Sequence, residues 1–148
     1  MFRVVSIVFI LFLSIPLMAD VSGSYSGSGH SLMHRSETRR ECSEIFLEIK
    51  VSDTSVEVAR YGYKCADLQA EVDPYRLRIV GSKLLTEDGE EIGSLSDGDL
   101  SIFYRSSEEN FSYEWRIKRS SEGKFSLFEE WREGERKALT LEGTLARM

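Results

Sequence analysis

The only two histidines of this 148-residue chain, His30 and His34, lie four residues apart. On a helix this spacing would place both imidazoles on one face, as a metal site requires. On a strand the two positions would be about 14 Å apart by rise alone. No cysteine or carboxylate motif with metal-ligand spacing accompanies them. We therefore interpret both as surface histidines and expect neither a metal ion nor a cofactor.

Two adjacent carboxylate pairs, Glu108-Glu109 and Glu129-Glu130, are the next candidates for chemistry. Neighbouring residues in a strand point to opposite faces, so such pairs do not converge as a general acid and base would. We interpret them as solvated turn and rim charges. The chain also has no Gly-x-Ser-x-Gly motif and no glycine-rich phosphate loop. We therefore expect a protein that is not an enzyme.

The cysteines, Cys42 and Cys65, flank a predicted β-hairpin. Within residues 45–58, two runs of alternating apolar residues surround a short polar turn, which is typical of paired strands. A four-residue turn at positions 52–55 would place Phe46 opposite Tyr61 and Cys42 opposite Cys65. Directly opposed residues have Cβ atoms about 4.5–5.5 Å apart, close to the separation that a disulfide needs. We predict a Cys42–Cys65 disulfide, which leaves no free nucleophilic thiol.

Residues 1–19 have the features of a signal peptide, with Arg3, a following apolar run and Ala19 before the expected cleavage point. The apolar run spans about 14 residues, fewer than the roughly 20 that a membrane-spanning helix needs. We therefore expect a single domain over residues 20–148, without a membrane span, in the periplasm or outside the cell. The choice between bacterial and eukaryotic secretion stays open. Disulfides are typical of such compartments.

The charged residues argue against several classes of partner. The chain has 25 acidic and 19 basic residues and a formal net charge of −6. An acidic protein without a basic cluster is poorly suited to nucleic acid. We expect a monomer that binds a small molecule, with a protein partner as the alternative.

Short runs of alternating apolar residues, separated by turn signals every 8–12 residues, indicate an all-β fold. Asp97-Gly98 is a strong hairpin signal, and residues 111–117 alternate most clearly. A chain of neighbouring hairpins can close on itself and so remove its exposed edges. We predict a closed antiparallel up-and-down β-barrel of about 8–10 strands. For residues 31–40, the sequence is compatible with either a strand or a short helix.

Aromatic residues gather on one face of the predicted strands. We name five candidate ligand-binding residues, which are Tyr25, Tyr104, Tyr113, Trp115 and Trp131. In an open barrel they would line a cavity and orient an apolar guest through hydroxyl and indole N–H groups. A filled aromatic core has the same sequence pattern. The pattern therefore does not distinguish an open lumen from a filled one.

Gly23-Ser24-Tyr25 resembles the Gly-x-Trp start of the lipocalins and their calycin relatives, with Tyr in place of Trp. Arg147, near the end of the last predicted strand, resembles the late basic residue that packs over that ring in the family. The resemblance implies a lipocalin-like carrier that binds an apolar small molecule in its lumen. The alternative function is a protein-interaction or inhibitor module that acts through its loops and has a filled core.

Overall fold

A computed structural model describes residues 21–121 and 123–148. The predicted signal peptide, residues 1–19, lies outside the described residues. The described part of the chain forms the strands β1 (Gly23–Met33), β2 (Thr38–Val51), β3 (Ser55–Cys65), β4 (Leu68–Val72), β5 (Tyr75–Val80), β6 (Lys83–Leu85), β7 (Glu91–Ser96), β8 (Asp99–Ser106), β9 (Phe111–Ser121), β10 (Lys124–Glu133) and β11 (Arg136–Arg147). No helix in these residues is long and apolar enough to cross a membrane.

The strands form one antiparallel sheet that closes on itself. From β5 to β11 each strand pairs with its neighbour along the chain, β11 pairs with β1, β1 with β2, and β2 with β3. β4 and β5 both pair with the same edge of β3, with Val72 opposite Tyr61 and Tyr75 opposite Val58. Pro74 between them has no N–H to donate, so the ladder is interrupted there. β4 and β5 therefore share one place in a ring of ten, which confirms the predicted barrel.

The β2–β3 hairpin contains the predicted disulfide. Cys42 and Cys65 are opposite each other in the ladder and are bonded. The turn at residues 52–55 begins directly after Val51, which faces Val56 as the alternating pattern requires. Local periodicity and a short turn were therefore sufficient to place the two thiols together.

One predicted pair within the hairpin is wrong. Phe46 faces Gly62, and Tyr61 faces Leu47 instead. The ladder shifts register twice, once at Ala59 on β3 and once at Ser43 on β2. Each β-bulge adds one residue to one strand, so the second cancels the first and restores the register at the disulfide.

Residues 31–40 are strand and turn in the structure, not helix. β1 continues to Met33 and β2 begins at Thr38. Gly27 allows the backbone of β1 to approach that of β11 closely, because a Cβ at Gly27 would lie 1.9 Å from the carbonyl oxygen of Thr144. The pairing with β2 also shifts between Gly27 and Gly29. Such close backbone approach is a typical reason for glycine within a strand.

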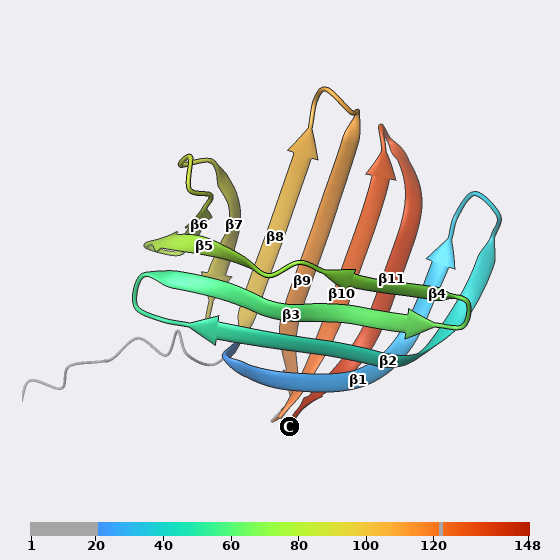
Figure 1. Cartoon of the computed structure of the whole chain (residues 1–148), viewed down its shortest axis with the longest axis horizontal. Coiled ribbons are helices and arrows are strands. Elements are labelled where there is room, and N and C mark those ends of the chain that lie inside the picture. Colours follow the sequence, from blue (N-terminus) through green and yellow to red (C-terminus); the bar gives the residue numbers. More distant parts are fainter. Residues whose placement is uncertain (1–20, 122) are drawn as a thin grey trace, which may run out of the picture.

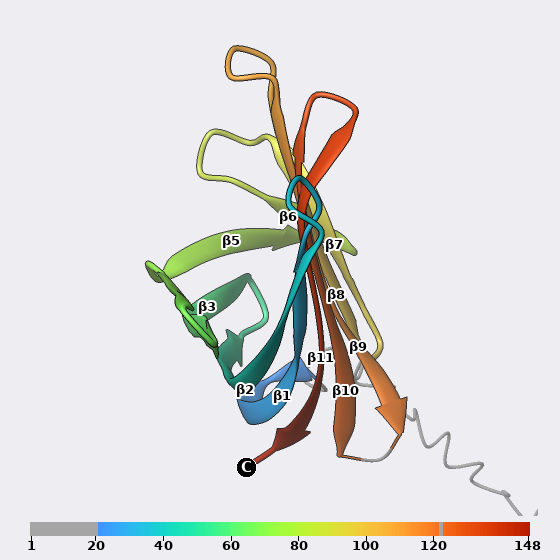
Figure 2. The ribbon, with the colours of Figure 1, turned by 90° about the vertical axis from the view of Figure 1, so that its right-hand side faces the viewer.

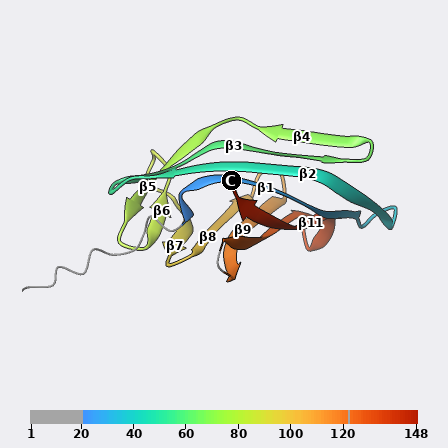
Figure 3. The ribbon, with the colours of Figure 1, turned by 90° about the horizontal axis from the view of Figure 1, so that it is seen from below.

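The barrel is flattened, with two unequal walls. Viewed from below, β2, β3 and β4 run along one side and β7 to β11 along the other (Figure 3). Figure 1 shows that β8 to β11 extend well beyond the crossing wall of β3, β4 and β5, and Figure 2 shows the two walls from the side. We call the end with these projecting strands the open end. Its turns touch, since the N–H of Gly134 donates to the carbonyl of Asn110 over 2.7 Å.

The opposite, closed end is packed with side chains. Tyr25 is fully buried there, and its ring meets that of Phe125 edge to face at 4.9 Å. The Arg147 guanidinium lies 5.5 Å from the Tyr25 ring centre, and its Nη2 donates to the Tyr25 hydroxyl over 3.0 Å. The basic residue over the first-strand aromatic ring, which the lipocalin resemblance implies, is therefore present.

Candidate functional site

A groove of about 280 Å³ lies at the open end of the barrel. We call it the mouth groove. It is lined by Val72, Tyr75, Ile92, Ile102, Tyr104, Phe111, Tyr113 and Trp131. These residues come from β4, β5 and from β7 to β10, at positions that alternate with outward-facing residues. The groove exists because the β3–β4–β5 wall ends before the longer strands opposite it do (Figure 1).

One wall of the mouth groove is aromatic. Trp131 on β10 is paired in the ladder with Tyr113 on β9, and their ring centres are 5.0 Å apart at 70°. Phe111 contacts the same indole at 5.2 Å and 54°. Tyr104 continues this wall on β8 and is 42% exposed. Rings that meet at steep angles present their faces in several directions, which suits an enclosed small molecule.

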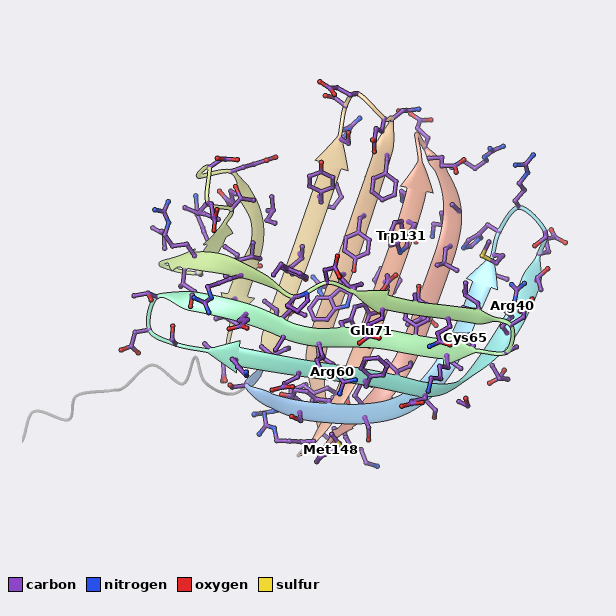
Figure 4. All side chains as sticks on the ribbon, in the orientation of Figure 1. Arg40, Arg60, Cys65, Glu71, Trp131 and Met148 are labelled. Carbon is purple, nitrogen blue, oxygen red and sulfur yellow. A yellow bond between two sulfur atoms is a disulfide. The ribbon has the colours of Figure 1, made fainter. Side chains whose placement is uncertain are left out.

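Behind this wall lies a buried carboxyl group, that of Glu129. It is 1% exposed and lies on the inner face of β10, two residues before Trp131. Figure 4 labels the Trp131 side chain on this strand. Its carboxylate accepts hydrogen bonds from the hydroxyls of Tyr61 and Tyr63 on β3 and from the indole N–H of Trp131. The interpretation of Glu129 as a solvated rim charge is therefore wrong. Glu129 and Trp131 are two residues apart on one strand, so the alternation that places Trp131 on the inner face also predicts an inward-facing Glu129.

Burial raises the pKa of Glu129, because the ionised form loses its hydration. The hydrogen bonds from Tyr61, Trp131 and Tyr63 act in the opposite direction without cancelling the effect. Burial, and then the Glu129 charge, also raise the pKa values of four hydroxyls, those of Tyr61, Tyr63, Tyr75 and Tyr113. These hydroxyls therefore stay protonated near neutral pH and remain available as donors.

The neighbouring Glu130 has a different environment. It points to the outer face, and its side chain is only 4% exposed because two cations cover it. Its carboxylate lies 2.6 Å from Arg132 Nε and 3.1 Å from Lys137 Nζ. Burial raises the pKa of Glu130, but the hydrogen bonds and charges of these cations outweigh it and leave the pKa lowered. Of the two predicted rim pairs, only Glu108-Glu109 lies exposed in a turn.

Three of the five candidate ligand-binding residues, Tyr104, Tyr113 and Trp131, line the mouth groove. Tyr25 lies at the closed end. Trp115 is 1% exposed and packs deeper, opposite Glu129 in the ladder and 5.6 Å from the Tyr61 ring centre. Its indole N–H has no hydrogen-bond partner among the described residues.

The two histidines lie apart from the mouth groove. His34 Nε2 is 2.7 Å from the hydroxyl of Thr140, and His30 Nε2 is 3.4 Å from the carboxylate of Glu142. Both are half-buried. Within residues 21–121 and 123–148, no group of three or more metal-ligating side chains is found.

Comparisons with known proteins place the fold. No family model and no curated protein sequence matches the chain. An S-type phycobiliprotein lyase from Guillardia theta has a similar structure, with a TM-score of 0.57 and 11% identity over 88% of this chain and 90% of that chain. A redesigned β-barrel, mFAP1, bound to DFHBI, gives a TM-score of 0.43 and 11% identity over 88% and 98% of the two chains.

The closed antiparallel barrel and the Tyr25–Arg147 contact at its end define a lipocalin-like β-barrel. The likeness to the lyase supports this fold.

Proposed function

We propose that the protein binds one small, largely apolar molecule in the mouth groove. The groove itself carries the proposal, because it joins six strands of a closed barrel in one apolar and aromatic concavity. Ligand sites have this character, with a few polar groups that orient the guest. The hydroxyls of Tyr75, Tyr104 and Tyr113 provide such groups, whereas the Trp131 N–H already donates to Glu129.

The size of the mouth groove limits the ligand. Its volume of about 280 Å³ is near the lower end of the roughly 300–1,000 Å³ that is usual for ligand sites. The closed end is filled by side chains such as Tyr25 and Phe125. We therefore infer a guest of one or two rings that enters at the open end.

The proposed protein is exported and acts by binding its ligand without catalysing a reaction. The leader over residues 1–19 would direct the protein to the periplasm or the cell exterior, where the Cys42–Cys65 bridge would be maintained. We infer a carrier or scavenger, since no nucleophile with an adjacent base is found among the described residues that line the groove. An interaction module that acts through its loops has less support, because the apolar and aromatic lining of the groove comes from the strands.

Titration with N-phenyl-1-naphthylamine, a neutral apolar fluorophore, tests the proposal. We expect saturable fluorescence enhancement with a stoichiometry near one. Trp131→Ala removes part of the wall and should weaken binding about tenfold or more. Phe103→Ala is the matched control, because Phe103 is 52% exposed and does not line the mouth groove. Absence of saturable binding to the wild-type protein would refute the proposal.

A further inference from the structure

Glu129 is a buried carboxylate for which the described residues provide no cation. Its three hydrogen-bond donors, Tyr61, Tyr63 and Trp131, are all neutral. Glu130, the next residue and nearly as buried, has both Arg132 and Lys137. A buried charge without a counter-charge is costly, so proteins normally pair such groups. The barrel interior thus has a carboxyl group without a positive partner, and a cation bound nearby would stabilise its ionised form.

The position of Glu129 connects this site to the mouth groove. Trp131 lines the groove and donates its indole N–H to the Glu129 carboxylate, so a single ring separates the two. Tyr113 lines the groove beside Trp131, and the pKa of its hydroxyl is raised partly by the Glu129 charge. A charge in the groove would therefore interact with Glu129 through a poorly screening, aromatic environment.

The groove wall itself favours one sign of charge. None of its eight lining residues is charged, so no Lys, Arg or His is present there to bind a carboxylate or phosphate group. Five of them are aromatic, and aromatic faces attract cations such as ammonium groups. The rings of Phe111 and Tyr113 lie at 54° and 70° to the Trp131 ring, so aromatic faces with different orientations border the groove, as in an aromatic cage.

We propose that the ligand of the mouth groove is a small organic cation, an ammonium group on an apolar body, with Glu129 as its counter-charge behind the Trp131 ring. This inference rests on the proposed function and specifies its ligand class. The ammonium group would contact the aromatic faces, and the apolar body would fill the remaining groove. Glu129 would act through space and through its hydrogen bond to the Trp131 indole, which makes Glu129 a positioning residue for the Trp131 ring.

A matched pair of probes tests the charge alone. Phenyltrimethylammonium and tert-butylbenzene have nearly the same shape, but only the first is charged, and its charge does not titrate. Both are used to displace N-phenyl-1-naphthylamine from the full chain with its disulfide oxidised. We expect the cation to bind at least tenfold more tightly than the neutral isostere. Glu129→Gln should reduce this ratio to about twofold or less, and Glu130→Gln, which removes the same charge from the outer face, should leave it unchanged.

The outcomes separate the two proposals. If the fluorophore binds but the cation displaces it less than tenfold better than tert-butylbenzene, the inference is overturned and the proposed function stands. The inference is likewise overturned if the tenfold ratio persists in Glu129→Gln. If the fluorophore does not bind at all, the proposed function fails and the inference fails with it.

A measurement on the wild-type protein keeps the test valid if Glu129→Gln does not fold. Protonation of Glu129 removes the counter-charge, while the tyrosines that face it, Tyr61, Tyr63, Tyr75 and Tyr113, stay neutral throughout the acidic range. The affinity for phenyltrimethylammonium should therefore fall as the pH is lowered through the Glu129 pKa, and that for tert-butylbenzene should not. Equal pH dependence of the two affinities would overturn the inference.

Discussion

At the scale of single residues, two adjacent glutamates show how strongly the direction of a side chain decides its chemistry. Glu129 points into the barrel among neutral donors, and Glu130 points outward between two cations. The pKa of the first is raised and that of the second is lowered. Their contributions to stability should therefore depend on pH with opposite signs.

We expect Glu129 to make the free energy of unfolding decrease as the pH rises. The unfolded chain releases this proton near pH 4.3, whereas the folded state retains it to higher pH because burial raises the pKa. The stabilisation is thus complete below the unfolded pKa and is lost as the pH rises through the folded one. Urea denaturation over a pH series should show that Glu129→Gln lacks this loss.

Glu130→Gln is the control for that series and has the opposite sign. Its folded pKa is lowered, so its contribution is present above the unfolded pKa and is lost as the pH falls through the folded value. The two variants should differ from the wild-type protein with opposite slopes. Parallel pH profiles for both variants would contradict the assigned environments.

The two tryptophans should respond differently to truncation. Trp115 is 1% exposed in the packed interior, so Trp115→Ala should cost about 3–5 kcal/mol of unfolding free energy. Trp131 is only partly buried at the mouth groove, so Trp131→Ala should cost less stability and more probe affinity. Chemical denaturation of both variants checks the order, and a larger loss for Trp131→Ala would contradict it.

At the scale of elements, the β2–β3 hairpin supplies two of the three donors to Glu129, Tyr61 and Tyr63. Both lie between the bulge at Ala59 and the disulfide at Cys65. The bulge at Ala59 moves the inward-facing positions of β3 from even to odd residue numbers, so Val58 is buried before it and Tyr61 is buried after it. The hairpin therefore connects the structural bridge to the candidate site.

Removal of the disulfide should destabilise the fold without abolishing the site. Cys42 and Cys65 are separated by 23 positions, and closing a loop of that size is worth about 3 kcal/mol by its effect on the unfolded chain. We expect the Cys42→Ser/Cys65→Ser double variant to lose about this much in urea denaturation. Its probe affinity at low urea should stay within about twofold of the wild-type value. A stability unchanged by the substitution would contradict the chain-entropy account.

At the scale of the whole molecule, the unequal length of the two walls creates the mouth groove. The β3–β4–β5 wall ends early, and β8 to β11 continue beyond it (Figure 1). Val72 and Tyr75, on either side of the interruption at Pro74, both line the groove at the rim of this shorter wall. A closed barrel can thus keep a packed end and an open end in one domain.

Processing of the chain is a prediction at the same scale. If residues 1–19 are a signal peptide, the exported protein should begin at or near Asp20. N-terminal sequencing of protein recovered from the periplasm or the medium measures this directly. Met1 at the start of exported material would contradict the prediction.

Much of the fold followed from the sequence by itself. Strict alternation, as in residues 111–117, and short turns such as Asp97-Gly98 are local properties, and they predicted the hairpins, the barrel and the disulfide. Alternation also separated inner from outer faces, which is why Tyr104, Tyr113 and Trp131 were named correctly as residues of one inner surface.

The tertiary structure alone decided which inner residues are accessible and what they contact. Alternation assigns a face to a residue but not its depth along the barrel, so Trp115 and Trp131 looked alike in the sequence. The donors to Glu129 lie on β3, with Tyr61 separated from it by 68 positions. Only barrel closure brings these strands together, and the resulting burial raises the pKa of Glu129.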